Sequence, residues 1–124
     1  MRRANKYSAV KTVVDGITFA SKAEARRYAQ LKLLERAGEI SNLETQPEFL
    51  FIVNGTPVKI RSEGYPNGRQ AKFRADFRYW DNRNNRTIVE DVKGGNATRT
   101  EAYALRKALV EALFPGVRIT EVTA

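Results

Sequence analysis

Residues 72–93 carry the pattern that most limits the folds open to this chain. Apolar and polar side chains alternate through residues 72–80, an Asn-rich turn follows at residues 81–85, and residues 86–93 form a second β-prone run. Alternation with a period of two is typical of a strand that buries one face. The sequence therefore predicts two neighbouring strands joined by a short turn.

Two acids and a lysine lie on these predicted strands. Asp76 is central in the first strand, and Asp91 and Lys93 are near the end of the second. Successive strand residues point to opposite faces, so Asp91 and Lys93 share a face while Glu90 points away. Asp76 and Asp91 are at similar distances from the turn, which lets their side chains converge. Carboxylates that bind Mg²⁺, with a cation near the attacking water, suit phosphodiester hydrolysis.

Each of these residues also has a simpler interpretation. Asp76 is compatible with an ion pair to a neighbouring Arg on an exposed strand face, and Asp91 and Lys93 with a strand end that frays before Gly94. Asp is disfavoured inside strands, so its position at the centre of an aromatic-rich strand favours a functional role. The combination of the two segments carries the prediction, because either segment alone occurs often by chance.

The amino-acid composition excludes several kinds of chemistry. The 124 residues contain neither Cys nor His, which excludes disulfides, thiol nucleophiles, cysteine zinc sites and Ser-His triads. Catalysis would have to use Asp, Glu, Lys, Tyr or a metal ion bound through oxygen. No apolar run approaches the roughly 18 residues of a membrane-spanning helix. We expect a basic N-terminal segment at residues 1–11 and one domain at residues 12–124.

The charge balance of the chain is strongly basic. Its net charge of +8 arises from 22 Lys and Arg against 14 Asp and Glu. A phosphate polymer is the natural partner of such a surface, although a solvated basic surface has the same composition. We expect six of these cations to contact DNA phosphates with little base specificity. They are Arg26, Arg27, Arg69, Lys72, Arg74 and Arg78.

The remaining patterns predict an α/β domain with a mixed sheet. An Asp-Gly pair between two β-prone triplets predicts a hairpin, and capping-box spacings that begin at Ser21 and Thr98 predict two helices. Gly and Pro in residues 62–70 predict an exposed loop. The expected elements in chain order are a hairpin at 12–19, a helix at 21–37, strands at 49–53, 58–61, 72–80 and 86–93, a helix at 98–114 and a strand at 117–122.

Glu24 is a third candidate acid, on the first predicted helix. At ~3.6 residues per turn it shares a stripe with Tyr28 and Leu31, which is the buried stripe of that helix. Its side chain is either the capping-box partner of Ser21 or an acid directed into a site. The two roles are physically compatible.

Taken together, these segments resemble the PD-(D/E)xK nuclease superfamily, and within it a branch of small phage-encoded proteins related to junction-resolvase-type nucleases. The position before Asp76 is Ala75 instead of the Pro in the superfamily's name. The similarity extends over roughly residues 5–122. Its segments in chain order are Asn5-Lys6-Tyr7, Asp15-Gly16-Ile17-Thr18-Phe19, Ser21-Lys22-Ala23-Glu24-Ala25, Gln46-Pro47, Ala75-Asp76-Phe77 and Glu90-Asp91-Val92-Lys93-Gly94.

The resemblance implies a restriction-endonuclease-like core, a mixed sheet of four to five strands flanked by helices, and a metal site at one edge of that sheet. It implies that Asp76 and Asp91 bind Mg²⁺ or Mn²⁺. The backbone carbonyl of Val92 would be a further ligand, and Glu24 would complete the metal shell.

The resemblance also implies roles for other residues. Lys93 would orient or deprotonate the attacking water and stabilise charge, and Gln46 would lie near the site. Glu90 stays open as an alternative ligand to Asp91, although only Asp91 shares a face with Lys93.

The expected function is metal-dependent hydrolysis of DNA phosphodiester bonds by an endonuclease, selective for branched or Holliday-junction DNA in phage recombination or replication. The resemblance further implies a homodimer and a cytoplasmic location in a bacterial host. Two alternatives stay open. One is a non-catalytic, basic nucleic-acid-binding protein with a degenerate nuclease fold. The other is an RNA-binding module that uses Phe73, Phe77 and Tyr79 as an exposed stacking platform.

Overall fold

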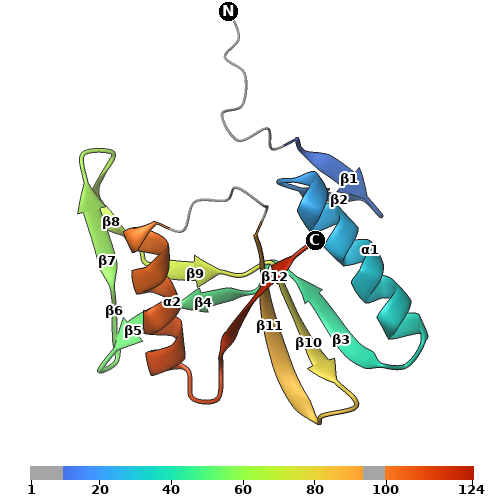
Figure 1. Ribbon diagram of the computed structural model, residues 1–124. Helices are drawn as coiled ribbons and strands as arrows, with labels where there is room; N and C mark the ends of the chain where they lie inside the picture. Colours follow the sequence, from blue (N-terminus) through green and yellow to red (C-terminus); the bar gives the residue numbers. More distant parts are fainter. Residues whose placement is uncertain (1–9, 94–99) are drawn as a thin grey trace, which may run out of the picture.

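The computed structural model describes residues 10–93 and 100–124 and shows a mixed α/β domain (Figure 1). Residues 1–9 of the expected basic segment lie outside the described residues. The described helices are α1 (Lys22–Arg36) and α2 (Glu101–Leu113). The strands are β1 (Thr12–Val14), β2 (Ile17–Phe19), β3 (Ile40–Thr45), β4 (Glu48–Leu50), β5 (Ile52–Val53), β6 (Thr56–Pro57), β7 (Lys59–Ser62), β8 (Tyr65–Gln70), β9 (Lys72–Arg74), β10 (Phe77–Asp81), β11 (Arg86–Lys93) and β12 (Ile119–Thr123).

A four-stranded mixed sheet forms the centre of the fold, in the order β12-β11-β10-β3. β10 pairs antiparallel with both β11 and β3, whereas β11 pairs parallel with β12. Parallel neighbours need a crossover connection, and α2 lies in the segment that connects β11 to β12. The expected α/β class, with a mixed sheet and helices, is confirmed.

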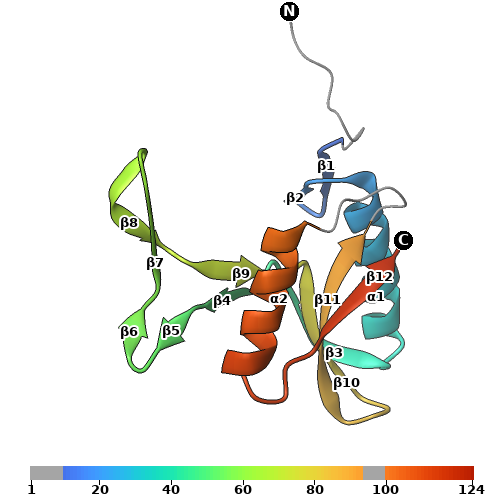
Figure 2. The same ribbon diagram turned by 60° about the vertical axis from the view of Figure 1, so that its left-hand side comes forward.

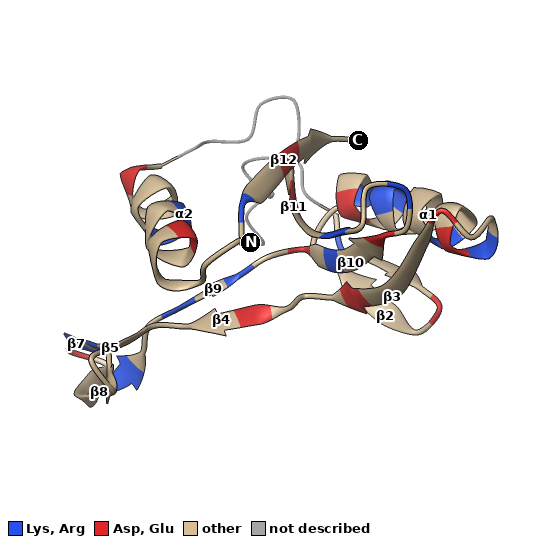
Figure 3. Cartoon of the chain, turned by 90° about the horizontal axis from the view of Figure 1, so that it is seen from below, with Lys and Arg blue, Asp and Glu red and all other residues tan. Residues whose placement is uncertain are grey.

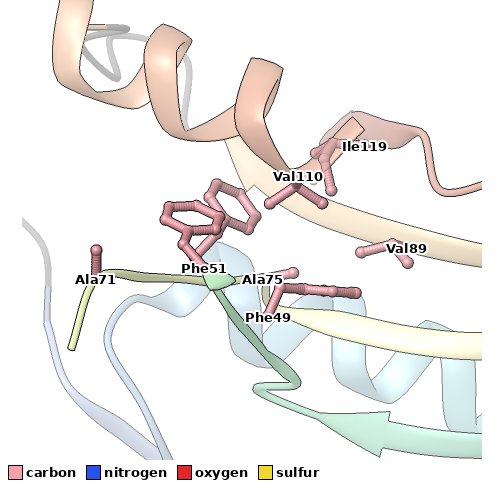
Figure 4. Close-up of a cluster of buried hydrophobic side chains, with 8 residues drawn as sticks. Phe49, Phe51, Ala71, Ala75, Val89, Val110 and Ile119 are labelled. Carbon is pink, nitrogen blue, oxygen red and sulfur yellow. The ribbon is translucent and has the colours of Figure 1, made fainter. Parts of the chain in front are cut away.

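One helix covers each face of this sheet (Figure 2). Tyr28 and Leu31 of α1 pack with Phe77 and Tyr79 of β10 on one face. Val110 of α2 packs on the other face with buried side chains from β4, β9, β11 and β12 (Figure 4). Burial of each large apolar side chain contributes about 1.5–3 kcal/mol. Because side chains alternate along β11, successive residues of that strand point to different helices.

Helix α1 begins where the capping spacing predicts. Ser21 is the N-cap, and its hydroxyl accepts the N–H of Glu24 at 3.1 Å. Farther along the helix, the Tyr28 hydroxyl donates to Asp15 at 3.0 Å and ties the β1–β2 hairpin to α1. Asp15 and Gly16 have φ values of +52° and +76°, and positive φ at both central residues is what a type I′ hairpin turn requires. The predicted Asp-Gly hairpin is therefore confirmed.

Helix α2 begins at a different capping residue from the one predicted. Thr100 is its N-cap, and the Thr100 hydroxyl accepts the N–H of Tyr103 at 3.1 Å. Thr98, the residue expected to open this helix, lies outside the described residues. In the ranges 10–93 and 100–124, no helix has the length and apolarity needed to cross a membrane.

The strand predicted at residues 72–80 is divided between two sheets. β9 pairs with β4, and β10 belongs to the central sheet, so Ala75 and Asp76 lie between the two strands. The predicted alternation of burial is present, but Phe73 and Ala75 pack in the core beneath α2 whereas Phe77 packs beneath α1. One alternating run thereby supplies both cores, and Asp76 occupies the point where the chain passes from one core to the other.

The exposed loop predicted at residues 62–70 was largely wrong, because this segment forms a hairpin of β7 and β8. Pro66 and Gly68 were interpreted as loop signals, but they are tolerated in β8 because this sheet has only two strands and both edges are open. The strand predicted at residues 49–53 is interrupted at Phe51, between β4 and β5.

Strand β3 was not predicted from the sequence. Asn42 has a φ of +57°, and the pairing of β3 with β10 shifts register nearby, between Arg78 and Trp80. Because of this irregularity, Ile40 and Leu43 both pack in the core beneath α1 although they are three residues apart. That spacing matches neither face of a regular strand.

Candidate active site

Asp76 lies immediately before β10, beside Asp91 of the neighbouring strand β11. In the β10–β11 pair, Phe77 is opposite Glu90. The same register continued by one residue places Asp76 opposite Asp91. The Asp76 N–H donates to the Glu90 carbonyl at 3.0 Å, which keeps the two chains paired at this point. The convergence predicted for these two acids is therefore present.

Both the backbone and the side chain of Asp76 accept hydrogen bonds from neighbouring segments. Its carbonyl accepts the N–H of Gln46 at 2.9 Å, and its carboxylate Oδ2 accepts the N–H of Val92 at 2.6 Å. Gln46 has a φ of +54°. Gln46 thus lies beside the site through its backbone, in agreement with the expectation for that residue.

Burial raises the pKa of Asp76 to about 8. This value of the pKa includes smaller increases from the negative charge of Glu24 and from the charge and hydrogen bond of Asp91, and a decrease from the Val92 N–H. A carboxyl group with this pKa is largely protonated at neutral pH. Charge interactions of this kind operate over short range, so the three acids are close neighbours.

Glu24 caps the first turn of α1 and is close enough to Asp91 for their charges to interact. Its backbone N–H bonds to the Ser21 hydroxyl, as in a capping box, but its carboxylate accepts the N–H of Ala20 at 3.4 Å instead of that of Ser21. Burial raises the pKa of Glu24, the Asp91 charge raises it too, and Arg74 opposes the change. The carboxylate of Glu24 therefore faces the two aspartates while it caps α1.

Lys93 is fixed by two contacts next to Asp91. Its Nζ lies 2.8 Å from Asp91 Oδ2 and 3.5 Å from the centre of the Tyr103 ring. Both members of the ion pair are almost buried, with 12% of the Lys93 side chain and 11% of the Asp91 side chain exposed. An ammonium over an aromatic face is attracted by the ring quadrupole. The predicted pairing of Asp91 with Lys93 on one face is present.

Two residues of this site, Tyr103 and Glu121, were not predicted from the sequence. The Tyr103 hydroxyl donates to Glu121 Oε2 at 2.8 Å, and Glu121 is the register partner of Asp91 on β12. Lys107 Nζ lies 3.7 Å from the same Glu121 oxygen. Burial raises the pKa of Tyr103, and the hydrogen bond to Glu121 and the charge of Asp91 raise it further. Both residues reach the site through pairing or packing across the fold, for which no local signal exists.

Glu90 lies on the opposite face of the sheet from Asp91. The Arg27 Nη2 atom approaches Glu90 Oε2 to 2.6 Å, and the Tyr79 hydroxyl donates to the same oxygen. Only 1% of Glu90 is exposed. The carboxylate of Glu90 is thus enclosed on the α1 side, and the structure favours Asp91 over Glu90 as the acid of this site.

Three of the six cations expected to contact phosphates are engaged by acids. Arg27 belongs to the buried cluster with Glu90 described above. Arg78 bonds to both carboxylate oxygens of Glu44, at 2.6 and 2.8 Å, and Lys72 bonds to Glu48 at 2.9 Å. These pairs neutralise part of the charge that the composition suggests.

The other three cations have different surroundings. Arg26 donates to the carbonyl of Ala124 at 2.9 Å. Arg69 lies over the Tyr65 ring, 5.7 Å from its centre. Arg74 is exposed and close enough to the site to lower the pKa of Glu24.

The exposed aromatic platform of the RNA-binding alternative is absent. Phe73, Phe77 and Tyr79 are 4%, 0% and 8% exposed, respectively. Their rings are core residues and are not accessible for stacking on bases, so the RNA-binding interpretation that depends on them was wrong.

The side-chain atoms of Asp76, Asp91 and Glu24 that could bind a metal ion are all carboxylate oxygens. Among residues 10–93 and 100–124, no group of three or more His, Cys, Asp or Glu is arranged to hold a metal ion. Mg²⁺, however, commonly binds through one or two carboxylates together with water and substrate phosphates. Asp76 and Asp91 form such a pair, with Glu24 near them, so the chemistry of the donor set fits a hard divalent cation.

A comparison with known families places the chain. The model of the DUF1064 family, described as a protein of unknown function, matches residues 4–124. The chain belongs to this family. The DUF1064 match includes every helix and strand of the fold and the whole acidic site, so the site is part of the family domain. No curated protein and no solved structure matches the chain.

Proposed function

We propose that this DUF1064 protein is a Mg²⁺- or Mn²⁺-dependent DNA endonuclease of the PD-(D/E)xK type. The observation that carries the proposal is the position of Asp76, at the start of β10, beside Asp91 of β11, with Lys93 bonded to Asp91. The mixed sheet with a helix on each face is compatible with a restriction-endonuclease-like core. The net charge of +8 suits a polyanionic substrate.

Asp76 and Asp91 would hold the cation, with Glu24 and the carbonyl of Val92 as candidates for the remaining protein ligands. A bound divalent cation supplies an activated water and polarises the phosphate. The raised pKa of Asp76, caused first by burial and then by the charges of Glu24 and Asp91, supports this assignment, because a divalent cation would offset that negative charge as a proton does.

Lys93 would act on the charges that change during hydrolysis. Its ammonium lies 2.8 Å from Asp91 Oδ2, within reach of a water held between the aspartates. A fixed cation at this position orients that water and balances negative charge on the phosphate. Removal of one such preorganised electrostatic group lowers kcat by a factor on the order of 10²–10³.

Selectivity for branched DNA and a two-fold dimer are the finer parts of the proposal. A dimer would present two sites to two strands, as cleavage of a four-way junction requires. Sedimentation of the protein alone and in complex with a four-way junction measures its oligomeric state. A monomer under both conditions would refute the dimer.

A non-catalytic DNA-binding protein is the second candidate. The ion pair of Asp91 with Lys93, and the absence of a three-acid metal group in the described part of the chain, favour it. It predicts salt-sensitive DNA binding without metal-dependent cleavage. The two candidates therefore differ in one measurable product, nicked or cut DNA.

The test incubates purified protein with supercoiled plasmid and with a labelled four-way junction, in Mg²⁺, Mn²⁺ or EDTA. The variants are Asp91→Asn and Lys93→Ala, and the matched control is Glu39→Gln, which alters an acid paired with Arg83 away from the site. We expect cleavage in metal only, lost in both site variants and retained in the control. Equal cleavage by all proteins, or none in any metal, would refute the nuclease.

A further inference from the structure

Strands β5 to β8, residues 52–70, form a double hairpin that extends away from the body of the domain (Figures 1 and 2). Its attachment is apolar, because Val58 and Ile60 pack against the core beneath α2. Beyond this attachment nearly every residue of the double hairpin is exposed. A segment of this shape contributes little to the core, so its exposed side chains point to a binding role.

Three cations of the double hairpin have no acidic partner. Lys59, Arg61 and Arg69 form no ion pair with any residue in the described ranges, and the double hairpin holds one acid, Glu63. Lys72 of β9 and Arg78 of β10, by contrast, are held by neighbouring acids. Figure 3 shows the basic segments on β9 and the double hairpin. The charge of the double hairpin is thus available to an external anion.

The β7–β8 pairing places Lys59 and Arg61 on one face of the double hairpin, and Arg69, which is opposite Ile60, on the other face. Gly68 has a φ of +86°, and a Cβ added there would lie 2.9 Å from Lys59 Cβ and 3.5 Å from Arg61 Cγ. The stems of Lys59 and Arg61 therefore lie over a position that has no side chain. Arg69 lies 5.7 Å from the centre of the Tyr65 ring, and 53% of Tyr65 is exposed. The double hairpin therefore carries two adjacent cations on one face, and one cation beside an accessible aromatic ring on the other.

We propose that the double hairpin is a DNA-binding arm that grips the phosphates of duplex DNA while the duplex lies across the acidic site. The choice of DNA rests on the proposed function. In both views the arm is set off to the left of the domain, and the turn of β7–β8 and the carboxyl end of β11, where Asp91 and Lys93 lie, point toward the top of the picture. A two-stranded ribbon also has the width to enter the major groove.

This arm differs from the phosphate track expected from the sequence. Arg27, Arg78 and Lys72 are committed to acids, so the main contacts move to Lys59, Arg61 and Arg69. Of the six cations expected to contact DNA phosphates, Arg69 alone lies on the arm.

The test measures binding of a labelled DNA duplex in EDTA, over a range of salt concentrations, so that binding is separated from cleavage. The arm variant is Lys59→Gln/Arg61→Gln/Arg69→Gln. The control, Arg36→Gln/Arg83→Gln/Arg86→Gln, removes the same charge from exposed positions at the other end of the domain. Thermal unfolding checks that both variants are folded. If the arm variant has no unfolding transition, the single change Arg61→Gln replaces it.

We expect the arm variant to lose at least tenfold in affinity near 0.1 M salt and to reduce the salt slope by about 2–3, or about 1 for Arg61→Gln. The control should change the slope by less than about 1. Equal losses in both triple variants, or none in the arm variant, would refute the arm. If the arm variant lost affinity while wild type failed to cut DNA in metal, the arm would stand without the nuclease. Tighter binding of an RNA duplex of the same sequence would refute the choice of DNA.

Discussion

Arg27 and Glu90, 63 positions apart in the chain, form a two-point ion pair beneath the central sheet: Nε lies 2.8 Å from Oε1 and Nη2 lies 2.6 Å from Oε2. The Tyr79 hydroxyl adds a further hydrogen bond to Glu90. Arg27 was expected to contact phosphates, but this pair gives it a structural role that joins α1 to β11.

Arg27→Ala is expected to destabilise the protein by about 3–5 kcal/mol, because it leaves the buried Glu90 carboxylate without its cation. Urea unfolding measures the loss. The neighbouring Arg26→Ala removes an exposed guanidinium that donates to the Ala124 carbonyl, and it should cost less than about 1 kcal/mol. Equal losses of unfolding free energy in the two variants would show that the Arg27–Glu90 ion pair does not stabilise the fold.

Asp76 makes the stability of the metal-free protein depend on pH. Its pKa is about 8 in the folded protein against an ordinary value of 3.8. The folded state therefore holds the proton more tightly than the unfolded chain, and the free energy of unfolding falls as pH rises from about 4 to 8. Glu24 acts in the same direction. Glu35 and Glu44 have lowered pKa values, so their contribution to stability is lost only as the pH falls below their ordinary pKa of 4.5.

Thermal unfolding in EDTA between pH 5 and 8 tests this expectation. The melting temperature of wild type should fall steadily over this range, and that of Asp76→Asn should change much less. A profile for Asp76→Asn as steep as that of wild type would assign the pH dependence to another group.

Mg²⁺ should stabilise the protein, and the effect should need both aspartates. Binding to the folded state alone adds about 2.7 kcal/mol at 100 times the dissociation constant. We expect a rise in melting temperature with Mg²⁺ or Mn²⁺ that EDTA reverses and that both Asp76→Asn and Asp91→Asn abolish. The rise should be larger at pH 8 than at pH 6, because the cation and the proton compete for the same carboxyl groups. An equal rise in the Asp91→Asn protein would place the cation elsewhere.

Tyr103 is expected to position Lys93 through its ring. Tyr103→Phe keeps the aromatic face 3.5 Å from Lys93 Nζ and should retain most cleavage activity. Tyr103→Leu removes that face, and we expect it to lower kcat by about tenfold with a smaller effect on KM. A purely structural residue would instead give parallel losses of activity and melting temperature in the two variants, which thermal unfolding would detect.

Features that depend on neighbours in the chain were predictable. The Asp15-Gly16 turn, the Ser21 cap and the shared face of Asp91 and Lys93 each involve residues one to three positions apart. Local backbone geometry alone decides such relationships, because hairpin turns and helix caps have specific φ requirements and strand faces alternate.

Relationships between distant residues were decided only by tertiary packing. The passage of the chain between two cores at Asp76, the bond of Arg27 to Glu90 and the contact of Tyr103 with Lys93 leave no periodic signal in the sequence. Each forms because one chain segment has to bury its apolar face against another, and that choice of partner is a property of the whole fold. The residue types of the candidate site could thus be named in advance, whereas their exact partners followed from how the sheet and two helices pack.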